Sequence, residues 1–327
     1  MKDIGLAGVP FSGRSTLFTA MTRTGAAGGR SNQAIVEVPD PRLDVLTRLE
    51  HSRKTVGAQV RFVDVPGGVS SPQGIADLRT SDALAIVLRA FGGDTEPAKE
   101  LEDVTAELLL ADMAVIDSAL EGARKRLKGK KGTSDEVAVL ERARDTLADG
   151  GLLRDAAFSD DDAKHLRSIQ PLTLKPWIVV ANLEEGAELP EGLSDGTVRV
   201  YASIEAETAE MEPAEARALL EEFGVEEPGL ETVIAACYRA LDLITFLTTG
   251  EDETRAWEVR RGATAPEAAG VIHTDLERGF IRAEVVAYDD LVAAGSWDAA
   301  QQAGNLRVEG KEYLVQEGDC MHIRFAV

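Results

Sequence analysis

The stretch GVPFSGRST, from Gly8 to Thr16, combines residue types and a spacing that suit phosphate binding. A phosphate-binding loop has the pattern G-x-x-x-x-G-K-[ST], in which backbone N–H groups cradle the phosphates and the Ser or Thr hydroxyl binds Mg²⁺. Here Ser15 supplies that hydroxyl, but Arg14 stands where the lysine is expected. The pattern predicts a nucleotide site and leaves open whether Arg14 permits chemistry there.

A second motif, DVPG from Asp64 to Gly67, follows a strand-like run and matches the D-x-x-G of GTPase-like proteins. In such proteins the aspartate helps to hold Mg²⁺, and the glycine N–H can bind the γ-phosphate. The alternative interpretation of DVPG is an ordinary β-turn that binds no ligand.

A third motif, ANLEE, ends a later strand where GTPases carry N-K-x-D. Asn182 is kept, whereas Leu183 replaces the lysine and Glu185 replaces the aspartate that accepts two hydrogen bonds from guanine. Adenine lacks the amino group that this aspartate reads, so the altered motif favours adenine over guanine. The alternative is that Glu184 and Glu185 are simply solvated loop acids.

The elements that must position these motifs are those of an α/β domain with a mostly parallel sheet. A strand-like run precedes the phosphate loop and a helix is predicted to begin at Ser15, which is the context that the loop requires. Near-continuous apolar runs indicate buried parallel strands, and ligands bind at the carboxyl edge of such sheets. The predicted strands are DIGLAGV, VGAQVRFVDVPG, SDALAIVLRAF and KPWIVVANLEE.

Between the last two of these strands the apolar period changes to that of helices. Apolar residues recur every three or four positions from Leu101 to Val115, and DEVAVLERARDTLADGG forms a second helical segment. We therefore expect an inserted antiparallel helical hairpin with a basic turn. The turn either contacts RNA phosphates or is a solvated turn after a helix C-terminus. Its basic residues are Arg124, Lys125, Arg126, Lys128, Lys130 and Lys131.

The C-terminal part of the chain has a different pattern. After a predicted amphipathic helix, EPGLETVIAACYRALDLI, strand-like pieces alternate with Gly turns. A single helix is predicted near Ala265 to Ile272. This pattern predicts a small mixed sheet with one helix.

Composition limits the partners and the compartment. The 327 residues include 57 acidic and 35 basic ones, a formal charge of −22, so the chain as a whole repels nucleic acid and anionic membranes. Any RNA contact must come from a local basic patch. The longest apolar runs are too short to span a bilayer and no signal sequence is recognisable, so we expect a cytoplasmic protein without a membrane partner. The sequence does not encode an oligomeric state.

Several longer stretches resemble the Obg-like ATPases of the YchF group over nearly the whole chain. VPDPRLDVLTRL is similar to the segment after that family's switch I, and ELLLADM resembles the start of its helical insertion. IEAETAEM and EEPGLETVI match later landmarks. The most specific match is RAWEVRRGATAPEAAGVIHTDLERGFIRAEV, because a similarity of this length in order is not expected by chance.

The resemblance implies an α/β fold with three parts. A P-loop G domain would comprise residues 1–92 and 172–242, an inserted coiled-coil hairpin residues 93–171, and a TGS-type β-grasp domain residues 243–327. The family is implied to bind ATP with Mg²⁺, to hydrolyse it slowly and to associate with ribosomes or ribosomal RNA.

Site residues follow from the resemblance position by position. Arg14, Asp64 and Gly67 are implied in catalysis, and Ser15 and Asp64 in holding the metal. The implied nucleotide-binding residues are Gly8, Phe11, Ser12, Gly13, Arg14, Ser15, Thr16, Asn182, Leu183, Glu185, Ala202 and Ser203.

Departures from the family pattern concern the catalytic parts. In the phosphate loop, the family's usual asparagine, valine and lysine are replaced by Phe11, Ser12 and Arg14. The segment between Arg23 and Val38 lacks the usual switch I with its Mg²⁺-binding threonine. The switch II segment after Asp64 is shorter than in the family. A guanidinium is wider than an ammonium and planar, so phosphate binding can survive while the donor geometry changes. One lost preorganised donor costs roughly two to three decades in rate. Slow hydrolysis and a non-hydrolysing scaffold therefore both stay open.

Overall fold

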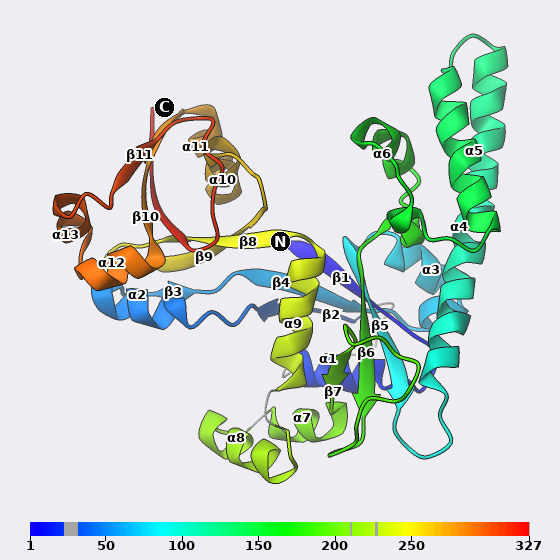
Figure 1. Cartoon of the computed structure of the whole chain (residues 1–327), viewed down its shortest axis with the longest axis horizontal. Coiled ribbons are helices and arrows are strands. Elements are labelled where there is room, and N and C mark those ends of the chain that lie inside the picture. The colour runs from blue at the N-terminus through cyan, green and yellow to red at the C-terminus, as the bar shows by residue number, and fades with distance from the viewer. Residues whose placement is uncertain (23–31, 210, 226–227, 327) are drawn as a thin grey trace. The chain divides into compact units, whose positions relative to one another are not determined.

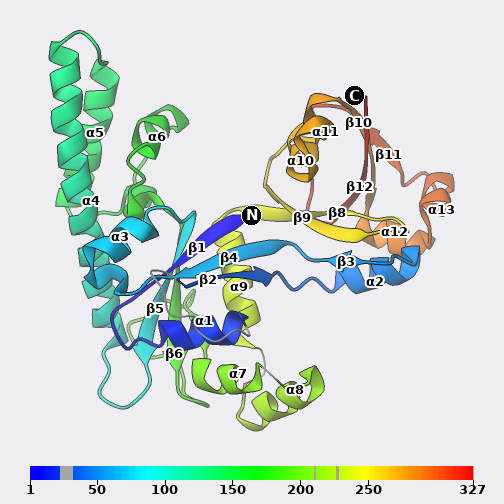
Figure 2. The same ribbon diagram turned by 180° about the vertical axis from the view of Figure 1, so that it is seen from behind.

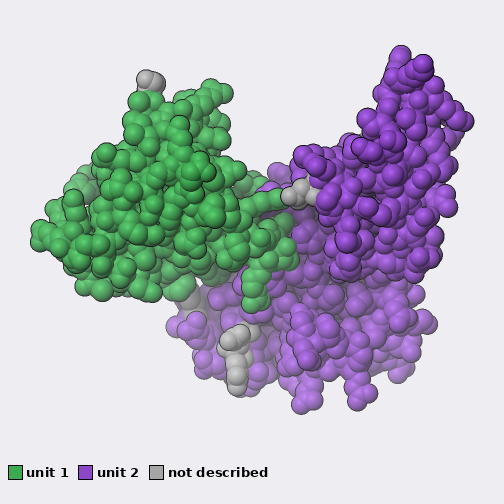
Figure 3. Space-filling model, turned by 45° about the horizontal axis from the view of Figure 1, so that its top comes forward, with its two compact units in different colours: residues 1, 36–60, 238–327 green, residues 2–35, 61–237 purple. Residues whose placement is uncertain are grey.

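The computed structural model describes all residues except 23–31, 210, 226–227 and 327. Contacts within the chain define two compact units (Figure 3). One unit comprises residues 2–35 and 61–237, and we call it the phosphate-loop unit. The other comprises residue 1 with residues 36–60 and 238–327, and we call it the C-terminal unit. In the part of the chain that is described, no helix is both long and apolar enough to cross a membrane.

A six-stranded sheet with the order β2-β4-β1-β5-β6-β7 carries the three motifs (Figure 1). Parallel pairing joins β1 to β5, β5 to β6 and β6 to β7, which confirms the predicted parallel sheet. The carboxyl ends of these four strands therefore share one edge. The strands are β1 (Lys2–Ala7), β2 (Asn32–Glu37), β4 (Gln59–Asp64), β5 (Ala83–Ala90), β6 (Trp177–Leu183) and β7 (Val198–Val200).

Helices of the phosphate-loop unit cover the sheet and extend from it. Leu84, Ile86 and Leu88 alternate along β5 and pack in one apolar core with Leu78 of α3 and Leu108 of α4. Helix α1 follows the phosphate loop and packs beside α7. The helices of this part are α1 (Arg14–Thr22), α3 (Pro72–Leu78), α4 (Pro97–Lys128), α5 (Ser134–Ala148), α6 (Asp160–Arg167), α7 (Ala202–Thr208), α8 (Pro213–Glu222) and α9 (Gly229–Ala240), with short 3-10 turns η1 (Gly68–Ser70), η2 (Leu153–Asp155) and η3 (Leu172–Leu174).

The predicted helical hairpin is present and is formed by α4 and α5, which lie side by side in both views (Figures 1 and 2). Its apolar stripe makes a core of its own, in which Ile116 and Leu120 of α4 meet Leu140 and Leu147 of α5, while Leu166 adds α6. Thr133 caps α5 by accepting a hydrogen bond from the Glu136 N–H. The outer part of the hairpin is thus stabilised by itself rather than by the sheet.

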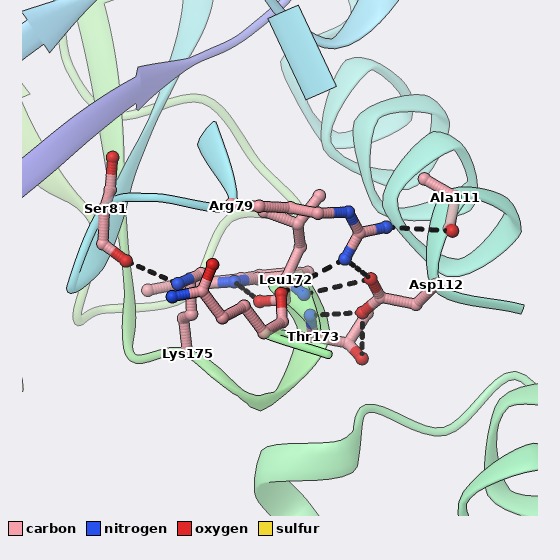
Figure 4. Close-up of polar contacts among 9 residues, drawn as sticks. Arg79, Ser81, Ala111, Asp112, Leu172, Thr173 and Lys175 are labelled. Carbon is pink, nitrogen blue, oxygen red and sulfur yellow. Dashed lines mark hydrogen bonds and ion pairs between the residues drawn. The ribbon is translucent and has the colours of Figure 1, made fainter. Parts of the chain in front are cut away.

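A buried ion pair fixes the inner part of the hairpin (Figure 4). Asp112 of α4 is fully buried, and its Oδ1 accepts from Arg79 Nη1 at 2.6 Å and from the Leu172 N–H at 3.0 Å. Its Oδ2 accepts from both the N–H and the hydroxyl of Thr173, each at 2.7 Å. We call Arg79, Asp112, Leu172 and Thr173 the hairpin anchor. The hairpin anchor joins Arg79, the residue directly after α3, to the middle of α4 and to η3, which lies just before β6.

The C-terminal unit contains the expected mixed sheet, with the order β11-β10-β12-β8-β9-β3. Antiparallel pairs join β10 to β11 and β12 and join β8 to β9, whereas β8 and β12 are parallel, as are β3 and β9. The strands are β3 (Thr55–Val56), β8 (Leu243–Thr248), β9 (Thr254–Arg260), β10 (Phe280–Ala287), β11 (Arg307–Glu309) and β12 (Asp319–Phe325).

Helices pack on both faces of this second sheet. Alanines of α10 (Ala265–Ile272) share a core with Phe246 of β8, whereas the neighbouring Leu247 points into a second core with α2, α12 and α13. The other helices of the unit are α2 (Arg42–Glu50), α11 (Thr274–Arg278), α12 (Tyr288–Ala294) and α13 (Trp297–Gln302).

Two expectations for this part of the chain were wrong. The amphipathic helix was expected to run through Ile244, but α9 ends at Ala240 and Asp242 turns the chain with a φ of 51° before β8 begins at Leu243. One helix was expected in the mixed sheet, whereas α11, α12 and α13 accompany α10. The first error arises because short apolar runs fit a helix or a strand until tertiary packing decides. The unexpected helices are only five to seven residues long, too short to show a helical period in the sequence. The domain boundaries and the TGS-type β-grasp assignment stay predictions.

Candidate nucleotide site

The phosphate loop joins β1 to α1 with the backbone conformations that glycine permits. Gly8 and Gly13 have φ values of 147° and 88°, and Phe11, which is 87% exposed, also has a positive φ of 68°. Helix α1 begins at Arg14, one residue before the predicted start, and its first turn holds no acidic residue. The first N–H groups of a helix have no intrahelical partner and attract anions. The loop therefore has the backbone conformation expected of a phosphate loop, and its binding of phosphate stays a prediction.

Asn182 at the end of β6 ties this loop to the start of α7. Its Nδ2 donates to the Ser12 carbonyl oxygen at 3.3 Å, and its Oδ1 accepts from the Ala202 N–H at 3.1 Å. A Cβ on Gly13 would lie 2.0 Å from Asn182 Nδ2, so the close approach requires glycine there. Residues of the first and third motifs, far apart in sequence, are thus brought together.

A pocket of about 540 Å³ opens beside the loop and includes two residues that the sequence reasoning missed. Arg89 lies near the carboxyl end of β5 and Phe91 directly after it, and the Arg89 guanidinium lies 5.2 Å from the centre of the Phe91 ring. A signal was available, since both residues lie at the carboxyl end of the predicted strand SDALAIVLRAF, where ligands bind. The remaining lining residues are Phe11, Ser12, Gly13, Arg14, Ser15 and Thr16.

The carboxylate of Asp64 lies on the inner side of the loop, next to α1. The Ser15 hydroxyl donates to Asp64 Oδ2 at 2.7 Å, so the two residues implied in metal binding are in direct contact. Asp64 Oδ1 is buried and accepts no hydrogen bond from the described residues, as is also true of the Ser12 hydroxyl. Buried polar atoms without partners are uncommon and often mark functional sites.

Arg14 turns its guanidinium toward this carboxylate. Its Nη1 lies 3.9 Å from Asp64 Oδ1 and donates to the carbonyl oxygens of Val65 at 3.3 Å and Leu6 at 3.5 Å. The Arg14 and Asp64 side chains are only 10% and 4% exposed. Burial lowers the pKa of the Arg14 guanidinium, an effect that the Asp64 carboxylate opposes. A guanidinium nevertheless keeps its charge in proteins, so the pair is ionic.

The turn after Asp64 has the conformation of a glycine turn. Gly67 has a φ of 80° and precedes η1, and the Gly68 N–H donates to the Val65 carbonyl oxygen at 3.0 Å. Gly67 thus follows closely after Val65, whose carbonyl oxygen accepts a hydrogen bond from Arg14. Its contact with a γ-phosphate stays a prediction.

The residues expected around the base differ in burial, although Asn182 and Ala202 are in direct contact. Leu183 is buried, whereas Glu185 and Ser203 are exposed, and no hydrogen bond joins either of them to the phosphate loop among the residues described. Glu184 instead accepts from the Gly92 N–H at 3.1 Å, so it is not merely a solvated acid. A role for Glu185 in reading the base stays a prediction. The segment between Arg23 and Val38 was expected to lack the switch I threonine. Most of this segment, residues 23–31, lies outside the described residues.

Half of the basic residues at the hairpin turn are neutralised by ion pairs. Arg124 pairs with Glu141, Lys125 with Glu121 and Arg126 with Glu136, each at 2.6 Å. No ion pair is seen for the other three within the described part of the chain, and all three are exposed. These three, which we call the tip lysines, are Lys128, Lys130 and Lys131.

Comparison with known proteins places the chain among proteins with this architecture. Residues 243–326 match the family YchF-GTPase_C, described as "Protein of unknown function (DUF933)". The chain is 39% identical to the ribosome-binding ATPase YchF of Haemophilus ducreyi and 38% identical to that of Bacillus subtilis, in each case over 99% of both chains. The solved YchF GTPase of Schizosaccharomyces pombe superposes with a TM-score of 0.85 at 27% identity, over 99% of this chain and 97% of that one. The chain belongs to the YchF family.

Proposed function

We propose that this protein binds ATP at the phosphate loop and acts in association with the ribosome. The observation that carries the nucleotide part is the convergence of three motifs: Ser15 contacts Asp64, and Asn182 holds the loop through the Ser12 carbonyl. The accidental occurrence of one glycine loop does not account for these contacts, because they join residues 49 and 170 positions apart.

ATP rather than GTP is favoured by what stands in place of the guanine-reading motif. Glu185 replaces the usual aspartate and is exposed, and Leu183 replaces the lysine and is buried. A site without the matching acceptor does not discriminate for guanine. The relatives at 38–39% identity are named ATPases, which supports the same choice.

Ser15 and Asp64 would hold Mg²⁺, because hydroxyl and carboxylate oxygens are the donors that this ion prefers. When bound, the ion would offset the negative charge of the triphosphate. The chain itself would contribute the N–H groups at the start of α1, which would face the phosphates. It would also contribute Arg14, which links the loop to the turn after Asp64.

Hydrolysis is slow or absent in this proposal, because Arg14 Nη1 is already engaged by the Val65 and Leu6 carbonyl oxygens. Catalysis of phosphoryl transfer depends on positioned charge, so a cation engaged by other groups lowers the rate. The non-hydrolysing scaffold is therefore the second candidate function, and this orientation of Arg14 favours it.

One experiment separates the two candidates. Bound ATP and released phosphate are measured in the same sample of purified full-length protein, for the wild type and for Arg14→Lys. A switch ATPase predicts a small release above the blank that rises roughly tenfold or more in Arg14→Lys. ATP bound with no release in the wild type would leave the scaffold standing, and absence of bound ATP would overturn both candidates.

The ribosome part of the proposal assigns RNA contact to the tip lysines. They are exposed and free of acidic partners in the described structure, whereas Arg124 and Arg126 are already paired. Each phosphate contact contributes about one unit to the salt dependence of binding. Replacing the three tip lysines by alanine should reduce ribosome co-sedimentation and lower the slope of log K against log salt by about two to three.

The matched control replaces the three paired residues Arg124, Lys125 and Arg126 by alanine, which removes the same formal charge. We expect a smaller effect on co-sedimentation, because these charges are partly neutralised by glutamates. Equal effects of the two triple variants would refute a specific role for the tip lysines. The relatives' printed name, ribosome-binding ATPase, supports the choice of ribosome as partner.

A further inference from the structure

The phosphate site contains a positive charge of its own beside the acidic residue that a metal would use. Arg14 Nη1 lies 3.9 Å from Asp64 Oδ1, and both side chains are almost fully buried. This Asp64 oxygen accepts no hydrogen bond from the described residues, so the guanidinium is the group that balances its charge. The other oxygen already accepts from the Ser15 hydroxyl.

The surroundings leave room for the Arg14 guanidinium and hold it through one nitrogen. Arg14 Nη1 is shared between the carbonyl oxygens of Val65 and Leu6, which come from the turn after β4 and from β1. A Cβ on Gly68 would lie 2.2 Å from the same nitrogen, so the absence of a side chain at Gly68 makes room for the planar group. A lysine ammonium is a compact point charge on an unbranched stem, so Arg14→Lys changes where the charge lies relative to Asp64.

These contacts bear on how the site would take up a metal. Hard cations such as Mg²⁺ need oxygen ligands in a strict octahedral arrangement. The oxygen donors of Ser15 and Asp64 fit that preference by type, but the hydroxyl is engaged by the carboxylate and the carboxylate faces a cation. A second positive charge at the same carboxylate would be repelled by the guanidinium.

We propose that Arg14 takes over part of the role of the divalent cation, so that ATP binding at this site depends only weakly on Mg²⁺. This inference rests on the proposed function, since it concerns the same phosphate loop. Arg14 is a positioning residue here: its charge compensates Asp64 and fixes the turn after β4 against the loop. The site is then ready for a triphosphate before any metal arrives.

The test is a calorimetric titration of full-length protein with ATP, once with excess Mg²⁺ and once with excess EDTA. For the wild type we expect the Kd to change by less than about threefold, and for Arg14→Lys to rise at least about tenfold in EDTA. Arg144→Lys, on the surface of α5, is the matched control and should behave as the wild type. Circular dichroism of each variant establishes that it is folded.

The outcomes separate the inference from the function on which it rests. If the wild type loses ATP affinity tenfold or more in EDTA, the inference is overturned while the nucleotide site stands. The same holds if Arg14→Lys and the wild type respond alike. If ATP binds in neither medium, the proposed function fails and the inference falls with it. Should Arg14→Lys fail to fold, the wild-type pair of titrations still decides.

Discussion

Among the described residues of the phosphate-loop unit, the buried pairs Arg79–Asp112 and Arg14–Asp64 differ in how completely their hydrogen bonds are made. In the hairpin anchor, each carboxylate oxygen of Asp112 accepts two hydrogen bonds, and Arg79 also donates to the Ala111 carbonyl oxygen at 2.9 Å (Figure 4). At the phosphate loop, Arg14 and Asp64 are 3.9 Å apart, and one oxygen of Asp64 accepts no hydrogen bond from the described residues.

The difference shows how the same pair of residue types can serve two purposes. A buried charge with every hydrogen bond made specifies one arrangement of the backbone, and removing one partner is costly. A buried charge with free acceptors is less stable by itself and has capacity left for a ligand. On this comparison the hairpin anchor is structural, and the Arg14–Asp64 pair has an acceptor left for a ligand.

The largest effect on stability is expected at the hairpin anchor. Asp112→Ala leaves the Arg79 charge and the Leu172 and Thr173 N–H groups without their acceptor, which should lower the free energy of unfolding by about 3–5 kcal/mol. Urea denaturation measures the change. Asp117→Ala, an exposed position on the same helix, is the control and should change stability by less than about 0.5 kcal/mol. Equal effects of the two substitutions would show that the anchor is not structural.

A smaller but clear loss is expected from Gly13→Ala in the phosphate loop. The added Cβ would lie 2.0 Å from Asn182 Nδ2, and the φ of 88° is unfavourable for alanine. Strain and a displaced hydrogen bond together should cost about 2–4 kcal/mol of unfolding free energy. Thermal unfolding and ATP binding both report the change.

Gly150→Ala separates crowding from backbone strain. Gly150 has a similar φ of 78°, but a Cβ there would meet no atom within 4 Å. We expect a cost of only about 1 kcal/mol and unchanged ATP affinity. A Gly13→Ala protein as stable as Gly150→Ala would contradict the close packing of Asn182 on the loop.

The smaller of two effects is expected when an aspartate-to-asparagine substitution is made in the less saturated pair. Asp64→Asn keeps one oxygen to accept from Ser15 but removes the charge that balances the buried Arg14 guanidinium, so the free energy of unfolding should fall by about 1–2 kcal/mol. Asp112→Asn places an amide donor against the N–H donors of Leu172 or Thr173, which should lower the free energy of unfolding by about 3 kcal/mol. Urea midpoints of the two variants give the comparison directly, and a reversed order would refute it.

The local part of the site could be predicted from the sequence. The glycine loop between a strand and a helix, Asp64 after a strand and Asn182 at the end of another are short-range patterns with a known geometry. The parallel sheet followed from apolar runs in the same way. In the structure Ser15 contacts Asp64 and Asn182 contacts the loop, whereas nucleotide binding by these residues stays a prediction.

Features that depend on tertiary contacts could not be predicted in this way. Asp112 is an acidic residue in a helical pattern, and nothing local indicates that Arg79, 33 positions away, completes it in the core. The orientation of Arg14 depends on carbonyls from β1 and from the turn after β4, and the charge of the hairpin turn depends on glutamates of both helices. Arg89 and Phe91 had a usable signal at the carboxyl end of a strand.

Every part of the proposed function requires that the phosphate loop binds ATP. Calorimetric titration of the full-length protein with ATP and, separately, with GTP measures occupancy and base choice together. We predict a saturable isotherm for ATP and a Kd for GTP that is at least about tenfold higher. Absence of binding of either nucleotide at millimolar concentration would contradict the account.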